Sequence, residues 1–193
     1  MDEFVVVALQ NIRFTGLTEL MALFSALGQM GFVWFIVAAT MLAVPRSRMA
    51  GLTMALSVAV CDILVAAVLA PLFARVDPAD AQIGVTAVTG VAHAGWCLPS
   101  IHAATSVASV VVAGLLRGKV GSIPCLFLAL VIMFSRLFCG VNYPTDLIAG
   151  ALVGALVAVV LSLLAHQLPW VAAARPSRAS RKKRSDTEVR VRK

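Results

Sequence analysis

Apolar runs long enough to cross a membrane are the feature that most restricts how this chain can fold. Spanning helices are expected at residues 20–44, 49–73, 99–117, 122–140 and 145–166. Each run approaches or exceeds the roughly 20 residues that a helix needs to cross a hydrocarbon core of about 30 Å. Because 61% of the 193 residues are hydrophobic and only 13% are charged, an ordinary soluble domain is excluded. We therefore expect an all-α, polytopic membrane bundle of about five transmembrane helices.

The segments before and after these runs are expected to differ in character. Residues 1–19 mix apolar side chains with a few charges, which predicts an amphipathic or partly inserted helix. Asp2 and Glu3 stand where a signal peptide carries basic residues, so no cleavable leader is expected. Nine Lys and Arg residues lie in 171–193. We therefore expect a membrane-embedded domain over residues 1–170 and a disordered basic tail over 171–193.

Basic residues in the short connections predict the orientation of the bundle. Arg46 and Arg48 lie between the first two runs, and Arg117 and Lys119 lie between the third and fourth. With five spans, both connections and the tail fall on one side, which the positive-inside rule makes cytoplasmic. The expected location is the plasma (inner) membrane, with the turn at 140–145 on the extracytoplasmic side.

The basic tail has two readings that the sequence leaves open. It serves only to orient the chain, or it also binds anionic lipid headgroups. Nucleic-acid binding is not expected, because no folded basic surface accompanies the tail. The sequence also leaves open whether the chain forms a homo-oligomer.

Two motifs lie at the expected extracytoplasmic ends of helices. They are Pro99-Ser100-Ile101-His102, and Ser135-Arg136 followed at fixed spacing by Asn142 and Asp146. Singly, each residue has a structural alternative: Arg136 as a snorkelling anchor, His102 as a satisfied polar group, and Asp146 as a helix N-cap. Together they match what a phosphate site needs, namely a cation, N–H donors at a helix N-terminus and a proton donor.

In this order and spacing the motifs resemble the second and third signatures of the type-2 phosphatidic acid phosphatase superfamily, Pro-Ser-Gly-His and Ser-Arg-x5-His-x3-Asp. The stretch 140–146 and segments around Leu27-Gly28 and 71–75 are similar to bacterial undecaprenyl-pyrophosphate phosphatases, and the resemblance covers roughly residues 17–166. It implies a polyprenyl phosphate or diphosphate, or a phosphatidic-acid-type lipid, as ligand. It implies neither a metal nor another cofactor.

The resemblance also implies a role for each matched position. Ser100, the Ile101 N–H group and Arg136 would bind phosphate. His102 would protonate the leaving group, and Asp146 would orient the nucleophilic imidazole. That imidazole would occupy the position of Asn142, whose amide nitrogen is not a competent nucleophile because its lone pair is delocalised.

Further departures from the family pattern fall on the phosphate-binding side. The first signature, Lys-x6-Arg-Pro, aligns with Ala70 and Asp77-Pro78, so both of its cations are missing. Ile101 replaces a glycine, which crowds a close backbone approach. Arg75 lies two residues before Asp77, which leaves open a partial substitution for a lost cation. Removing one donor that stabilises the transition-state charge lowers the catalytic rate by about 10²–10³-fold. These losses together therefore predict little hydrolysis by the family mechanism.

These observations leave several functions open. One is a weak or re-purposed lipid phosphatase, in which His102 becomes the nucleophile or activates water beside Asn142. The second is a pseudophosphatase that binds or transports a lipid phosphate or scaffolds a membrane partner, and the lost cations favour it. The third is a purely structural membrane subunit.

Three details outside the motifs are also informative. Asp62 lies within the second span, where a carboxylate is either satisfied inside the bundle or acts as a proton or substrate relay. Gly150 and Gly154, four residues apart, predict close helix packing. Cys97 and Cys139 both lie near the outer face, which leaves a disulfide between them open.

Overall fold

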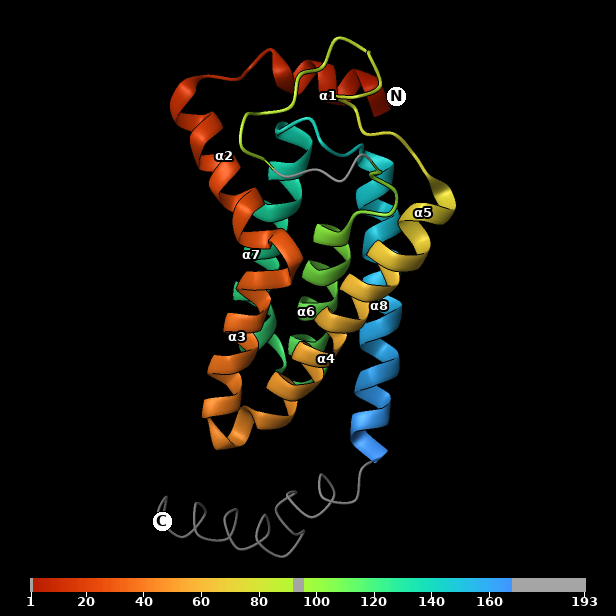
Figure 1. Ribbon diagram of the computed structural model, residues 1–193. Helices are drawn as coiled ribbons and strands as arrows, with labels where there is room; N and C mark the ends of the chain where they lie inside the picture. The colour runs from red at the N-terminus through yellow and green to blue at the C-terminus, as the bar shows by residue number, and fades with distance from the viewer. Residues whose placement is uncertain (1, 92–95, 168–193) are drawn as a thin grey trace, which may run out of the picture. The chain divides into compact units, whose positions relative to one another are not determined.

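The computed structural model describes residues 2–91 and 96–167 (Figure 1). The chain divides into two units, Met1–Ser162 and Leu163–Lys193, and the packing described below is that of the first. The basic tail predicted over 171–193 lies outside the described residues.

The described chain is helical, as the apolar runs predict. The helices are α1 (Asp2–Gln10), α2 (Thr15–Gly28), α3 (Phe32–Ala43), α4 (Arg48–Leu64), α5 (Ala70–Phe73), α6 (Ile101–Arg117), α7 (Lys119–Phe138) and α8 (Pro144–Gln167). Four segments are long and apolar enough to cross a membrane, namely Thr15–Ala43, Pro45–Phe73, Lys119–Phe138 and Pro144–Gln167, and α6 is a shorter apolar helix. The predicted all-α membrane bundle is confirmed, and the chain is an integral membrane protein.

Two of the spanning segments contain an irregular turn. The first breaks at the 3₁₀ turn Gln29–Gly31, where Met30 (φ 48°) and Gly31 (φ 63°) adopt left-handed backbone angles. The second passes through a π-helical turn at Val65–Leu69. Irregular backbone at membrane depth is tolerated where it is buried in protein or lines a cavity. Met30 and Ala66 do line a cavity, which is described below.

Helix α6 is central to the bundle and packs against α3, α4 and α7, while α2 packs against α7. The main apolar core includes the buried side chains of Trp34, Met54, Val112 and Ile132. The Trp34 indole N–H donates to Ser106 Oγ at 3.1 Å, so this large residue is satisfied inside the core.

Helix α8 approaches α6 through its glycines. A Cβ at Gly150 would overlap the carbonyl oxygen of Ser100, and one at Gly154 would overlap that of Ala104. The close packing predicted from the spacing of these glycines is therefore confirmed.

Helix α1 and the chain after α5 cover the end of the bundle that carries both motifs (Figure 1). Val6 of α1 is fully buried in a small cluster with Val85, Cys97 and Tyr143. In the next connection, Arg13 Nε and Nη2 donate to the Phe138 carbonyl at 2.9 and 2.6 Å. Helix α1 is thus attached to the bundle rather than lying apart at the interface.

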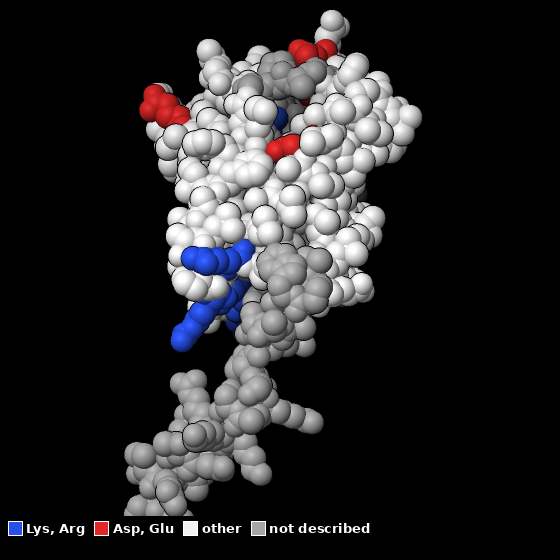
Figure 2. Space-filling view, turned by 60° about the horizontal axis from the view of Figure 1, so that its bottom comes forward, with Lys and Arg blue, Asp and Glu red and all other residues white. Residues whose placement is uncertain are grey.

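The basic connections meet at the opposite end. Arg117 Nη1 donates to the Arg46 carbonyl at 3.2 Å, which joins the α3–α4 and α6–α7 connections. Figure 2 shows Lys and Arg side chains gathered at this end, with Asp and Glu mainly toward the other. Such separation of charge is what the positive-inside rule requires, and the cytoplasmic assignment of this end stays a prediction. All four cysteines are free, so Cys97 and Cys139 are not bonded.

Candidate functional site

A cavity of about 500 Å³ lies at the end of the bundle that carries the motifs. Its lining is mostly apolar and includes Met30, Ile63, Ala66 and Trp96. The charged and hydrogen-bonding side chains in the lining are Gln29, Asp62, Asp77, Ser100, His102, Arg136 and Asn142. An apolar cavity with a few convergent polar groups is the usual form of a small-molecule or lipid headgroup site.

The start of α6 forms one side of this cavity. Ser100 is the N-cap, as predicted, and its Oγ accepts from the Ala103 N–H at 3.5 Å. Its own N–H donates to the Asp146 carbonyl at 3.0 Å, which ties α6 to the start of α8. Ile101 also lines the cavity. The positive end of the α6 dipole is therefore available to an anion.

Arg136 is buried, with 6% of its surface exposed, and lines the cavity instead of snorkelling outward. Its Nε donates to Asn142 Oδ1 at 3.0 Å, and its Nη1 donates to Ser25 Oγ at 2.9 Å. These bonds fix the plane of the guanidinium, which suits forked recognition of an anion.

Asn142 occupies the position where the family pattern has its nucleophile. Its Nδ2 donates to the Cys97 carbonyl at 2.9 Å, while its Oδ1 accepts from Arg136. Both ends of the amide are therefore bonded, which fixes the side chain at the cavity wall. Burial raises the pKa of the neighbouring Cys97 thiol, so this group is protonated and is not a replacement nucleophile.

His102 points toward α2. Its Nε2 lies 3.0 Å from the Ser25 carbonyl, and since a carbonyl only accepts, Nε2 carries the hydrogen. Gly28 permits this approach, because a Cβ there would lie 2.7 Å from His102 Cδ2. Ser25 thus contacts both His102 and Arg136, although it lies outside both sequence motifs. We name Ser25, His102, Arg136 and Asn142 the cavity cluster.

Asp146 is placed differently from the other motif residues. It is fully buried and does not line the cavity. Its Oδ2 accepts from the Tyr143 N–H at 2.7 Å, and its Oδ1 accepts from Arg75 Nη1 at 2.7 Å. Both carboxylate oxygens are bonded to groups other than the side chain at position 142.

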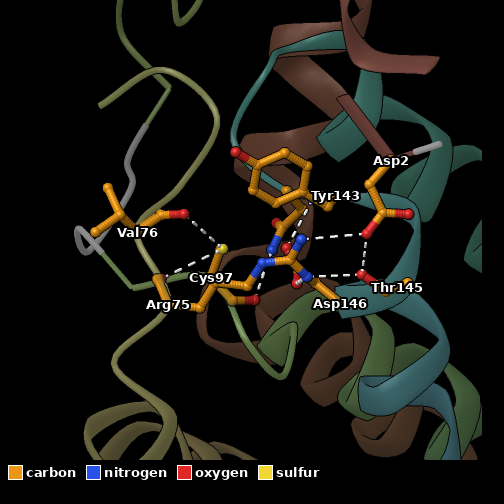
Figure 3. A network of polar contacts seen from close by, with 8 residues as sticks. Asp2, Arg75, Val76, Cys97, Tyr143, Thr145 and Asp146 are labelled. Carbon is orange, nitrogen blue, oxygen red and sulfur yellow. Dashed lines mark hydrogen bonds and ion pairs between the residues drawn. The ribbon is translucent and has the colours of Figure 1, made fainter. Parts of the chain in front are cut away.

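Arg75 connects Asp146 to the N-terminal helix (Figure 3). It pairs with Asp2 Oδ2 at 3.1 Å and donates to Thr145 Oγ1 at 2.6 Å. Thr145 in turn donates to Asp2, and the guanidinium lies 4.1 Å from the centre of the Tyr143 ring. We name Asp2, Arg75, Thr145 and Asp146 the outer clamp. Arg75 is not among the cavity-lining residues, so it does not stand in for the missing cations.

The charges of the outer clamp stabilise one another. The Thr145 hydroxyl, together with Arg75, lowers the pKa of Asp2 despite an opposing effect of burial. Burial alone would lower the pKa of Arg75, but the bond to Asp2 and the charge of Asp146 outweigh it and raise this pKa. Both groups are therefore charged across the ordinary pH range.

Asp77 brings negative charge to the cavity wall, as predicted from its alignment with a family cation. It is 1% exposed, and its Oδ1 accepts from the N–H groups of Ala79 and Asp80 at 3.1 and 3.0 Å. The carboxylate thus holds the turn after α5 while facing the cavity.

This bundle, with a helix N-terminus and a buried arginine at one cavity, defines a polytopic membrane protein. The profile described as PAP2 superfamily matches residues 48–170, more than half of the chain. The chain belongs to the PAP2 superfamily, as its motifs predicted.

Individual relatives agree with this assignment. The lipid A 4'-phosphatase of Bacteroides thetaiotaomicron is 30% identical over 119 residues, which are 59% of this chain and 53% of that protein. The chain thus spans about half the length of this curated relative.

Two crystal structures share the fold. The PAP2-type phosphatidylglycerolphosphate phosphatase of Bacillus subtilis has a TM-score of 0.70 at 23% identity, covering 86% of this chain and 85% of that one. LpxE of Aquifex aeolicus has a TM-score of 0.69 at 22% identity, covering 82% and 92%. The resemblance to bacterial undecaprenyl-pyrophosphate phosphatases stays a prediction.

Proposed function

We propose that this PAP2-superfamily protein binds the phosphate headgroup of a membrane lipid in its cavity and hydrolyses it poorly or not at all. The ligand is a polyprenyl phosphate or diphosphate or a phosphatidic-acid-type lipid. Arg136, Ser100 and the Ile101 N–H group contact the phosphate, and His102 lies beside it. The cavity opens toward the extracytoplasmic side.

The observation that carries this proposal is the bonding of Asn142. Its amide is not nucleophilic, and it is held between Arg136 and the Cys97 carbonyl. Asp146, the residue that would orient a nucleophile, is bonded instead to Tyr143 and Arg75. Ser100, Ile101 and Arg136 line the cavity, whereas the imidazole is absent from position 142 and Asp146 is bonded elsewhere.

The alternative is a phosphatase with a changed nucleophile. His102 lines the cavity and is the remaining imidazole in the motifs, so it would attack phosphorus or activate water, with Asn142 as a donor to the phosphoryl oxygen. Because Nε2 carries the hydrogen bonded to the Ser25 carbonyl, the lone pair for this step is on Nδ1.

The test is phosphate release from undecaprenyl pyrophosphate and phosphatidic acid by the purified protein in detergent. Asn142→His and His102→Ala are run beside the unmodified chain, with lipid retention measured by native mass spectrometry. We expect retention without release, and no more than slight release from Asn142→His, because Ala70 and Asp77 still replace both cations.

Two results would overturn the proposal. Release by the unmodified chain that His102→Ala abolishes would establish an enzyme with a changed nucleophile. If the chain neither releases phosphate nor retains lipid, then it has no functional phosphate site, and a structural subunit is the remaining hypothesis.

A further inference from the structure

Asp62 is a group of the cavity that the phosphate site does not use. It projects from α4 within the second apolar span and lines the cavity. Its Oδ1 is buried without a hydrogen-bond partner, and no Lys or Arg pairs with it among the described residues. An intramembrane carboxylate is costly unless it is neutralised, and it usually has a cationic partner or a functional role.

The backbone around Asp62 is irregular on two sides. A Cβ at Gly31, in the break between α2 and α3, would lie 3.3 Å from Asp62 Oδ2. The π-helical turn Val65–Leu69 begins three residues after Asp62. Such turns occur frequently at functional sites. The carboxylate therefore lies where two spans bend around the cavity.

The depth of Asp62 relative to the phosphate-binding residues follows from α6. Gly28 abuts His102, whereas Gly31 abuts both Asp62 and Thr105. Thr105 comes three residues after His102, about 4.5 Å further along the helix. Asp62 thus lies about one helical turn deeper in the bundle than His102. Arg136 lies at the level of His102, because Ser25 is hydrogen-bonded to both residues.

The cavity lining consequently carries charged groups of both signs. Arg136 and the α6 N-terminus favour an anion, while Asp62 and Asp77 add two carboxylates to the same lining. A diphosphate, with several negative charges, would share the cavity with both carboxylates, and like charges repel strongly at low dielectric. A ligand with one phosphate ester and one cation matches both signs of charge.

We infer that the cavity selects a lipid phosphate whose headgroup also carries a protonated amine, with the phosphate at Arg136 and the ammonium at Asp62. This inference rests on the proposed function and narrows its ligand class. A short carbon bridge between phosphate and amine spans one helical turn. Ethanolamine phospholipids and polyprenyl phosphates that carry an amino sugar share this chemistry.

The test compares phosphate lipids with and without a free amine. Native mass spectrometry of the detergent-purified full chain measures retention of phosphatidylethanolamine, N-acetyl-phosphatidylethanolamine and phosphatidylglycerol at equal concentration. A polyprenyl phosphate with a free or N-acetylated amino sugar forms a second arm. We expect the free amine to be retained at least tenfold better in one arm, since a charge-assisted bond is lost on acetylation. The arm that shows this preference identifies the lipid class.

Asp62→Asn, which keeps shape and removes charge, should abolish the amine preference while phosphate-lipid retention persists. Glu19→Gln, an exposed carboxylate outside the cavity lining, is the matched control and should keep the preference. Equal retention of free and acetylated amines in both arms would overturn the inference and leave the proposed function standing. A preference for the free amine that persists in Asp62→Asn would also overturn the inference. Failure of the unmodified chain to retain any phosphate lipid would overturn both.

Discussion

The cavity cluster and the outer clamp are each built around one arginine, but the two arginines have different partners. Arg136 is buried and bonds to the neutral oxygens of Asn142 and Ser25. Arg75 is partly exposed and lies between the carboxylates of Asp2 and Asp146. A cation that lines the cavity is available to an anion there, whereas one held between two carboxylates outside the lining is already neutralised. The comparison indicates that surroundings, more than motif identity, decide which retained residue contacts a ligand.

Replacing the buried arginine should have the largest effect. Arg136→Met leaves Asn142 Oδ1 and Ser25 Oγ without their donor, and each such buried group costs about 1–3 kcal/mol. We expect a loss of about 2–4 kcal/mol in unfolding free energy and at least a tenfold loss in lipid-phosphate retention. Unfolding in detergent and native mass spectrometry measure the two effects. If Arg136→Met retains lipid phosphate as strongly as the unmodified chain does, then Arg136 does not contact the phosphate.

Rebuilding the family pattern in the cavity should come next in size. Asn142→His combined with Ala70→Lys and Asp77→Arg restores a nucleophile and two cations, and each restored donor is worth about 10²–10³-fold in rate. We expect phosphate release at least 10²-fold above Asn142→His alone, measured with phosphatidic acid. The gain is limited because Asp77→Arg also removes the acceptor for Ala79 and Asp80. Equal rates for the two variants would show that the outer clamp, not missing charge, prevents turnover.

Replacing the partly exposed arginine should affect stability more than binding. Arg75→Met removes the charged donor to Oδ1 of the buried Asp146, at an expected cost of about 1–3 kcal/mol. Lipid-phosphate retention should change by less than about threefold, because Arg75 does not line the cavity. Arg136→Met is measured beside it. If Arg75→Met loses more lipid-phosphate retention than Arg136→Met, then the outer clamp, and not the cavity cluster, contacts the ligand.

Acidification should produce the smallest effect. Because the pKa of Asp2 is lowered in the folded chain, its bonds stabilise α1 above the ordinary Asp pKa and are lost as pH falls through the lowered value. Less than about 1 kcal/mol is expected, since the pair is partly exposed. Amide exchange of α1 near pH 3 should exceed that near pH 6 after correction for the intrinsic rate. Asp2→Asn should exchange fast at both pH values, and a pH difference that persists in this variant would assign the effect elsewhere.

The sequence predicts the bundle well because membrane-spanning runs depend on local composition. The start of α6 is also local, since Ser100 caps its own helix. The first span begins earlier than expected, at Thr15, and its break at Met30 and Gly31 was not predicted. Gly31 permits left-handed backbone angles, but Met30 carries no local signal for them.

The partners of the site residues were the part that the sequence did not predict. Ser25 lies 111 positions from Arg136, and Arg75 lies 71 positions from Asp146. Serines in apolar helices are common, so nothing local distinguishes Ser25. Arg75 was considered as a substitute cation, and only the folded chain places it beside Asp2. Family motifs align the residues but contain no information on these non-local bonds.

The contact of Gly150 and Gly154 with the α6 backbone has a mechanical consequence. Two helices in direct backbone contact slide or separate only with difficulty, so α6 and α8 form a stiff half of the molecule that carries Ser100 and His102. The opposite half, with breaks at Gln29–Gly31 and Val65–Leu69, has fewer regular backbone bonds to resist bending. Breathing motions that admit a lipid headgroup should therefore occur between α2–α3 and α4, with the stiff half as a fixed reference against which the ligand is positioned.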